Sequence, residues 1–298
     1  MAGLPTLAIT GSTGELGGRV ARVLAGRGVP QRLIVRDTTR APRLDGAEPV
    51  VASGYDDRDA MREAMAGAHT LYFVSGREDP DRLEQHRNVV AAAKEAGVAR
   101  IVYVSFLAAA EDATFTLARH HWATERAIED AGIAHTFLRS SLYLDFMPFF
   151  AGAEGVIRGP AGKGRFGPVA RDDLAASAGA VLAAADEAGT SSSPHDGRTY
   201  ELTGPELVDL AEVAFRLEAA SDKSVRYVPE TIEQAWESRR ETGAPDWEIE
   251  GWISSYLAIG DGSLEKLTRD VTELTGSPPQ DLEACLAAHP ELLAPLAG

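Results

Sequence analysis

Short apolar runs alternate with longer amphipathic segments through the first half of the chain. The apolar runs predict strands at 7–10, 32–35, 49–51, 70–74, 100–104 and 135–138. Between them, apolar residues at helical spacing predict helices at 16–27, 57–66, 82–96 and 117–131. Because strands and helices alternate, we predict an α/β fold with a parallel sheet and helices on both faces. Right-handed crossovers favour a doubly wound arrangement of that sheet.

The pattern changes after residue 150. A glycine-rich stretch at 151–168 predicts a loop with a short hairpin or strand. A helix at 171–185 and a late strand at 199–202 follow, and helical segments then continue to the C-terminus. The chain is therefore expected to divide into a first domain at 1–150, a connecting segment at 151–203 that partly returns to it, and a smaller, mainly helical domain at 204–298.

One short motif is more specific than the periodicity. Gly11, Gly14 and Gly17 stand three residues apart, between the first predicted strand and the first predicted helix. In such a turn the first glycine permits the turn, the second leaves room for a pyrophosphate and the third lets the helix pack on the strand. The N–H groups of the helix start favour the phosphate charge. The motif predicts that 1–150 is a Rossmann domain that binds a dinucleotide, with 204–298 as a substrate or lid domain.

Ligands of such sheets bind beyond the carboxyl ends of the strands. We therefore expect the cofactor to be bound by the glycine motif together with residues that follow the other predicted strands. The expected residues are Gly11, Ser12, Thr13, Gly14, Glu15, Leu16, Gly17, Arg36, Tyr55, Val74, Ser75, Ser105 and Phe106.

Two neighbouring residues after the second predicted strand favour different cofactors. Asp37 has the spacing of the acidic residue that accepts hydrogen bonds from the ribose of NAD. Arg36 precedes it and suits the 2′-phosphate of NADP through charge-assisted hydrogen bonds. We favour Arg36, and hence NADP in the form of NADPH, with NAD as the alternative.

Composition narrows the range of partners. The net charge of −16 argues against a nucleic-acid partner and against an anionic membrane surface. Cys285 is the only cysteine, which excludes an internal disulfide and a zinc–cysteine site, and no metal site is expected. No run is long and apolar enough for a leader or a membrane span, so we expect a cytoplasmic protein.

The Tyr-x-x-x-Lys pair of ordinary short-chain dehydrogenases is missing. None of the seven tyrosines has a lysine four residues later. If Glu125 marks the helix position that usually follows this pair, Leu117 replaces the tyrosine and His121 replaces the lysine. Because histidine titrates near neutral pH, His121 is a candidate both to bind the cofactor and to donate a proton to a reduced oxygen. Its alternative role is that of a structural helix residue.

With this substitution the chain resembles the NmrA-like group of atypical short-chain dehydrogenases/reductases, and within it the NADPH-dependent quinone oxidoreductases. The matching segments are Ile9-Thr-Gly-Ser-Thr-Gly-Glu-Leu-Gly17, Val35-Arg-Asp37, Gln85-His-Arg-Asn88, Ile101-Val-Tyr-Val-Ser105, His121-x-x-Thr-Glu125 and Tyr200-Glu-Leu-Thr-Gly204. The resemblance implies an oxidoreductase that passes hydride from NADPH to a quinone-like or other conjugated aromatic acceptor. The chain departs from the family at Arg139-Ser-Ser-Leu-Tyr143, where those quinone reductases carry Arg-Asn-Gly-Trp-Tyr.

The enzyme hypothesis assigns catalytic roles to His121, Tyr143 and Ser105. Tyr143 and the segment 146–150 are expected to form an apolar wall for a flat ring, so the expected partner is a small aromatic or quinone substrate. Loss of the usual catalytic pair is also compatible with a redox-sensing regulator that binds NADP(H) without turnover. A reductase of benzylic or isoflavonoid-type substrates is a third hypothesis, and the sequence leaves open whether the chain forms a homodimer.

Overall fold

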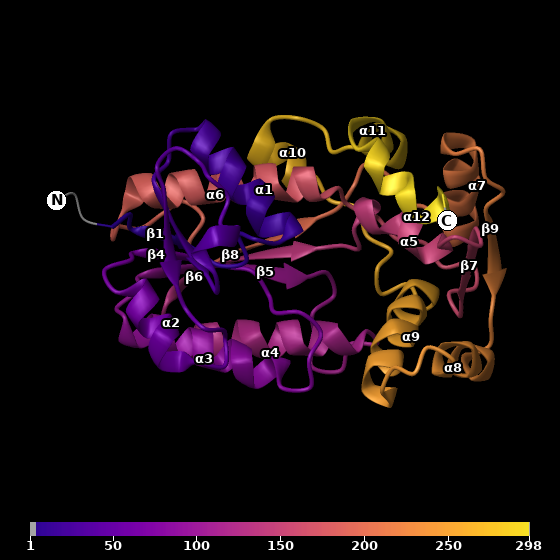
Figure 1. The fold of residues 1–298 in the computed structure, drawn as a ribbon, viewed down its shortest axis with the longest axis horizontal. Helices are drawn as coiled ribbons and strands as arrows, with labels where there is room; N and C mark the ends of the chain where they lie inside the picture. Colours follow the sequence, from indigo (N-terminus) through magenta and orange to yellow (C-terminus); the bar gives the residue numbers. More distant parts are fainter. Residues whose placement is uncertain (1–3, 298) are drawn as a thin grey trace. The chain divides into compact units, whose positions relative to one another are not determined.

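The computed structural model describes residues 4–297. Seven strands form one sheet in the order β3-β2-β1-β4-β5-β6-β8 (Figure 1). The pairs β3–β2, β2–β1, β1–β4 and β4–β5 are parallel, which confirms the predicted doubly wound sheet. The strands are β1 (Leu7–Ile9), β2 (Gln31–Val35), β3 (Ala47–Val51), β4 (Thr70–Phe73), β5 (Arg100–Phe106), β6 (Ala134–Ser140) and β8 (Arg198–Leu202).

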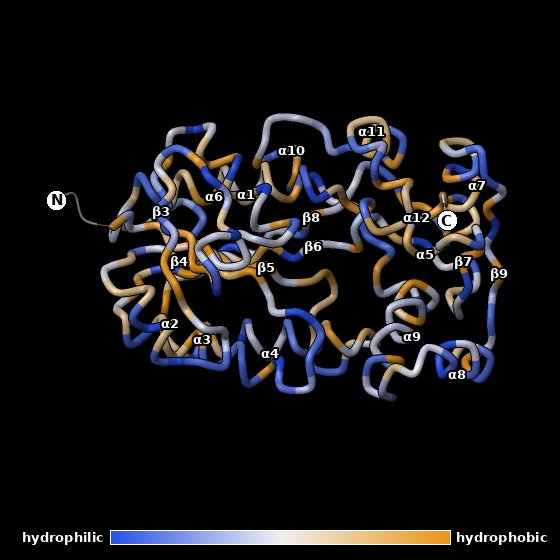
Figure 2. The backbone as a smooth tube through the Cα atoms, viewed as in Figure 1, coloured by the Kyte–Doolittle hydropathy of each residue, from blue (hydrophilic) through white to orange (hydrophobic). Residues whose placement is uncertain are grey.

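Helices cover both faces of this sheet, as the alternating pattern predicts. The flanking helices are α1 (Glu15–Gly26), α2 (Arg58–Met65), α3 (Arg82–Glu95), α4 (Thr116–Asp130) and α6 (Arg171–Ala188). Helices α1 and α6 lie on one face, and α2, α3 and α4 lie on the other (Figure 1). Hydrophobic residues, coloured orange in Figure 2, are frequent along strands such as β4 and β5, where Leu71, Phe73 and Tyr103 are fully buried. Burial of these strands on both faces explains their continuous apolar runs.

After β6 the chain is mainly helical, and besides β8 it contributes two strands to a second, small sheet. Strand β7 (Val156–Gly159) pairs in parallel with β9 (Arg226–Pro229). The expected strand in 151–168 is therefore present, but its partner lies far along the chain rather than in a hairpin. The further helices of this part are α5 (Met147–Ala151), α7 (Leu210–Ala220), α8 (Ile232–Arg240), α9 (Asp246–Gly260), α10 (Asp270–Thr275), α11 (Leu282–Ala288) and α12 (Ala294–Ala297). Short 3-10 turns lie here at Leu144–Phe146 and Pro290–Leu293, and between β2 and β3 at Thr38–Arg40.

The chain forms two compact units, and it passes between them several times. The first unit comprises the chain up to Phe106 together with His120–Arg139 and Leu174–Tyr200. The second comprises Leu107–Arg119, Ser140–Asp173 and the chain from Glu201 onward. The domain limits expected at residues 150 and 203 remain a prediction. Within residues 4–297, no helix combines the length and apolar character needed to cross a membrane.

Candidate functional site

The three glycines of the first turn meet different requirements. Gly11 has a φ of +67°, which favours glycine, and a Cβ on Gly17 would lie 2.3 Å from the carbonyl oxygen of Gly11. Gly14 has a φ of −97°, and a Cβ there would meet only that same oxygen, at 3.4 Å. The fold itself therefore requires glycine at Gly11 and Gly17 but not at Gly14. The bare backbone at Gly14 leaves room for a group from outside the protein.

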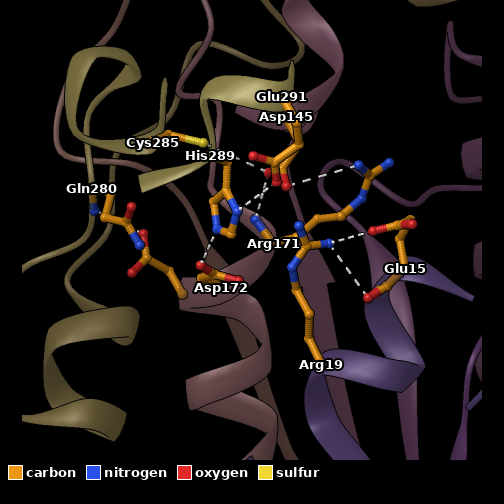
Figure 3. Close-up of polar contacts among 10 residues, drawn as sticks. Glu15, Arg19, Asp145, Arg171, Asp172, Gln280, Cys285, His289 and Glu291 are labelled. Atoms are coloured by element: carbon orange, nitrogen blue, oxygen red, sulfur yellow. Dashed lines mark hydrogen bonds and ion pairs between the residues drawn. The ribbon is translucent and has the colours of Figure 1, made fainter. Parts of the chain in front are cut away.

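The start of α1 is suited to an anion. Gly14 is the N-cap residue and offers no side chain to the first N–H groups of the helix. Among the described residues the buried hydroxyl of Ser12 has no hydrogen-bond partner. The carboxylate of Glu15 accepts a hydrogen bond at 3.0 Å from Arg19, one turn further along α1 (Figure 3). The open start of α1 and the Ser12 hydroxyl fit the pyrophosphate of a dinucleotide, and the pairing with Arg19 offsets the negative charge of Glu15.

A cleft of about 500 Å³ lies in the first unit at the carboxyl ends of the first four strands. It contains six of the residues expected to bind the cofactor, namely Gly11, Thr13, Arg36, Tyr55, Val74 and Ser75. Gly54 and Gly76, which follow predicted strands at the expected ligand edge, line it as well. Sequence reasoning missed its other polar contributors, Ser53, Asp56, Arg77, Asp79 and Gln85. The remaining expected residues, which are Ser12, Gly14, Glu15, Leu16, Gly17, Ser105, Phe106 and His121, do not line this cleft.

Arg36 and Asp37, which favour different cofactors, differ in their surroundings. Arg36 lines the cleft. Asp37 caps the turn that follows, and its Oδ1 accepts hydrogen bonds from the backbone N–H of Thr39 at 2.9 Å and from the Thr39 hydroxyl at 2.7 Å. These hydrogen bonds from Thr39 lower the pKa of the Asp37 carboxyl. Arg36 therefore contributes a positive charge to the lining of the cleft, while the Asp37 side chain stabilises the turn at Thr38–Arg40.

Tyr55 forms part of the cleft wall. Its hydroxyl donates to the carbonyl oxygen of Val74 at 2.8 Å and so joins the loop after β3 to the end of β4. Burial raises the pKa of Tyr55 to about 12, so the phenol is neutral. The ring packs edge-on against Phe73, with ring centroids 5.5 Å apart. Tyr55 therefore presents a fixed ring to the cleft.

Ser105 is tied to a buried ion pair. Its hydroxyl donates to Glu125 at 2.6 Å, and the guanidinium of Arg139 donates two hydrogen bonds to the same carboxylate, at 2.8 and 2.6 Å. Glu125 and Ser105 are both buried. A buried carboxylate is stable only when it is paired in this way. Sequence reasoning missed Arg139 as the partner of Glu125, and the contact gives Ser105 a role in holding α4 against β5.

His121 is enclosed by two partners. Its Nε2 lies 3.1 Å from the guanidinium of Arg82, and its Nδ1 lies 2.9 Å from the hydroxyl of Tyr103. Because a guanidinium can only donate, Nε2 accepts and the ring proton resides on Nδ1. Burial and the adjacent Arg82 charge hold the pKa of His121 well below its usual value. The ring also lies beside Phe106, with ring centroids 6.1 Å apart. His121 is thus a neutral residue with both nitrogens engaged, and its catalytic role remains a prediction.

Tyr143 belongs to the second unit. The hydroxyl of Ser140 donates to the Tyr143 hydroxyl at 3.3 Å, and the guanidinium of Arg171 lies 4.7 Å from the centre of the Tyr143 ring. Arg171 is held in turn by its backbone N–H, which donates to Asp145 at 2.8 Å (Figure 3). These contacts fix the tyrosine ring, whose catalytic role also remains a prediction.

The aromatic segment after Tyr143 is partly open to solvent. The rings of Phe146 and Phe149 are stacked with centroids 5.2 Å apart, and 44% and 54% of the two residues are exposed. Phe150 packs edge-on against Phe146 and also contacts the ring of Tyr256. No group of histidine, cysteine or acidic residues in 4–297 is arranged to hold a metal ion.

Known proteins resemble this chain over most of its length. The model of the NmrA-like family matches residues 5–227. Quinone oxidoreductase 2 of Escherichia coli is 34% identical over 279 residues, which cover 91% of this chain and 94% of that protein. The crystal structure of an NADPH-dependent quinone oxidoreductase of Escherichia coli, complexed with NADPH, has a TM-score of 0.83 and 32% identity, covering 95% of this chain and 99% of that one. Triphenylmethane reductase of Citrobacter sp., complexed with NADP(H), has a TM-score of 0.80 and 33% identity over 95% and 99% of the two chains.

Proposed function

The chain belongs to the NmrA-like family, and on that premise we propose that it is an NADPH-dependent oxidoreductase that passes hydride to a quinone-like or other conjugated aromatic acceptor. The observation that carries the proposal is the bare backbone at Gly14, which the fold itself does not require. The similarity to an NADPH-dependent quinone oxidoreductase and to a triphenylmethane reductase supports the cofactor and the acceptor class.

The described residues suit each part of this cofactor. The Gly11–Gly17 turn and the start of α1 would hold the pyrophosphate. Arg36 would bind the 2′-phosphate through charge-assisted hydrogen bonds, and Tyr55 would bound the adenosine end of the cleft. When bound, NADPH supplies the hydride, while the protein supplies orientation and a shaped pocket.

The acceptor is proposed to meet aromatic rings. Tyr143, Phe146 and Phe149 present rings suited to a flat conjugated molecule. Reduction of a quinone needs protons on its oxygens, and water can supply them. Because both nitrogens of His121 are engaged, we assign His121 to positioning rather than to proton donation, and Ser105 to support of Glu125.

The test is NADPH oxidation by the purified protein against a panel of quinones and triarylmethane dyes, with calorimetric titration of NADPH and NADH. We expect turnover with at least one acceptor. Tight NADPH binding without turnover on any acceptor would contradict the enzyme proposal and favour a redox-sensing regulator. Absence of NADPH binding would overturn both proposals.

Arg36→Ala is expected to weaken NADPH binding about ten- to hundredfold and to leave NADH binding unchanged, because one charge-assisted contact is lost. Calorimetric titration measures both constants. Arg40→Ala is the matched control, since Arg40 is exposed nearby but does not line the cleft. Equal affinities of the unmodified protein for the two cofactors would contradict the assignment of Arg36.

His121→Ala is expected to lower the rate of hydride transfer by about tenfold or less, below the usual contribution of a general acid. Single-turnover kinetics at saturating acceptor measure this rate. Tyr103→Phe, which removes one partner of the His121 ring, should have a similarly small effect. A loss of more than about a hundredfold in a folded His121→Ala variant would restore His121 as the proton donor.

A further inference from the structure

One residue that lines the cleft, Gly76, has both its backbone N–H and its carbonyl oxygen hydrogen-bonded to buried side chains. Gly76 follows β4 and lines the cleft. Its N–H donates to Nε2 of His86 at 2.8 Å, and its carbonyl oxygen accepts from Nε of Arg82 at 2.9 Å. Both side chains come from α3 and are buried, His86 completely. The buried side chains of His86 and Arg82 therefore fix the backbone position of Gly76 in the cleft lining.

The proton on His86 is fixed by a directed chain of hydrogen bonds. Because Nε2 accepts from Gly76, the ring proton lies on Nδ1, which donates to the hydroxyl of Thr124 at 2.8 Å. That hydroxyl donates onward to the carbonyl oxygen of His120 at 2.7 Å. Thr124 thus selects the tautomer of His86 that can accept from the cleft wall. The chain runs from the wall through α3 to α4.

Position 76 is also closely packed. A Cβ on Gly76 would lie 3.3 Å from Nε2 of His86 and 3.6 Å from the ring of Tyr55. The absence of a side chain allows the imidazole to reach the backbone N–H. The His86 ring is itself packed edge-on against Phe73, with ring centroids 5.1 Å apart. A rotation of the imidazole would therefore disturb the wall directly.

We propose that His86 is a positioning residue that preorganises the Val74–Arg77 wall for the dinucleotide. His86 does not line the cleft, so it acts through the backbone of Gly76. When this wall is already ordered in the free protein, cofactor binding does not include the loss of conformational entropy that ordering it would cost. This inference rests on the proposed NADPH site. It assigns part of the cofactor affinity to a residue that contacts no cofactor.

The test compares two replacements of the same ring. His86→Phe keeps the ring packing but removes the acceptor, and we expect the Kd and KM for NADPH to rise about tenfold, the value of one hydrogen bond. His86→Gln places an amide oxygen near the position of Nε2 and should restore affinity to within about threefold of the unmodified protein. The rate at saturating NADPH should change less than about twofold in both variants, because hydride transfer itself is untouched.

If His86→Phe does not fold, the variant Thr124→Val tests the same inference. Thr124→Val preserves shape and removes the acceptor for Nδ1–H, so the favoured tautomer is lost and NADPH affinity should fall about three- to tenfold. Unchanged NADPH affinity in a folded His86→Phe or Thr124→Val variant would overturn the positioning role. Failure of the unmodified protein to bind NADPH would instead overturn the proposed function, so the two failures are distinguishable.

Discussion

Gly14→Val is expected to weaken NADPH binding by about a hundredfold or more while the protein keeps its fold. The backbone of Gly14 has a φ that any residue adopts, and a Cβ there meets no atom closer than 3.4 Å. The valine therefore fits the free protein. Its methyl groups would occupy the space above the start of α1 that the pyrophosphate needs. Calorimetric titration of NADPH and thermal unfolding of the same preparation measure the two effects separately.

Two further glycines of α1 provide controls. Gly26→Val should leave NADPH binding unchanged, because a Cβ on Gly26 has no atom within 4 Å. Gly17→Ala should instead destabilise the fold, because its Cβ would lie 2.3 Å from the Gly11 carbonyl oxygen. Affinity like that of the unmodified protein in folded Gly14→Val would remove the glycine turn from the cofactor site.

Much of the fold was predictable because the first unit is built from local, regularly spaced signals. The run 70–74 predicted β4, whose four residues are all buried, and the pattern at 82–96 predicted α3. The pairing of β7 with β9 was not predictable, since Val156 and Arg226 meet only through the packing of distant segments. A short strand carries no local mark of its partner.

Residues of the candidate site were predictable from the sequence where one residue type is required for a specific structural or binding role. The glycine turn is such a case. The structural role of Asp37 was also predictable, because an aspartate followed two residues later by Thr39 is typical of a capped turn. Gly76 and Arg77 follow a predicted strand but carry no ligand-specific pattern. The partner of Ser105 was hidden for another reason. Glu125 comes twenty residues later, and only the packing of α4 on β5 brings it within 2.6 Å.

Stability is expected to fall as the pH drops below the ordinary histidine pKa of about 6.5, because His86 and His121 are buried and neutral. Burial, followed by the Arg82 charge, holds the pKa of each ring well below that value in the folded protein. The unfolded chain therefore binds more protons than the folded one in the interval between the two pKa values. Each histidine should lower the free energy of unfolding by up to roughly 1.4 kcal/mol per pH unit there, or roughly 2.7 kcal/mol for both.

Urea denaturation in a series of buffers from about pH 7.5 to about pH 5 measures this slope. Carboxyl groups with a lowered pKa, such as Asp196 beside Arg100, reduce stability only below their ordinary value of 3.8. Burial also lowers the pKa of His195, which adds to the loss, whereas burial raises the pKa of Asp173 and Asp186, which opposes it. The double variant below therefore identifies the share of the slope that belongs to His86 and His121. The double variant His86→Gln, His121→Gln should flatten the dependence, since an amide does not titrate. An equally steep dependence in the double variant would show that other groups cause the loss. A flat dependence in the unmodified protein would mean that the two rings keep their ordinary pKa when folded, and the lowered pKa of His86 and His121 would then have to be abandoned.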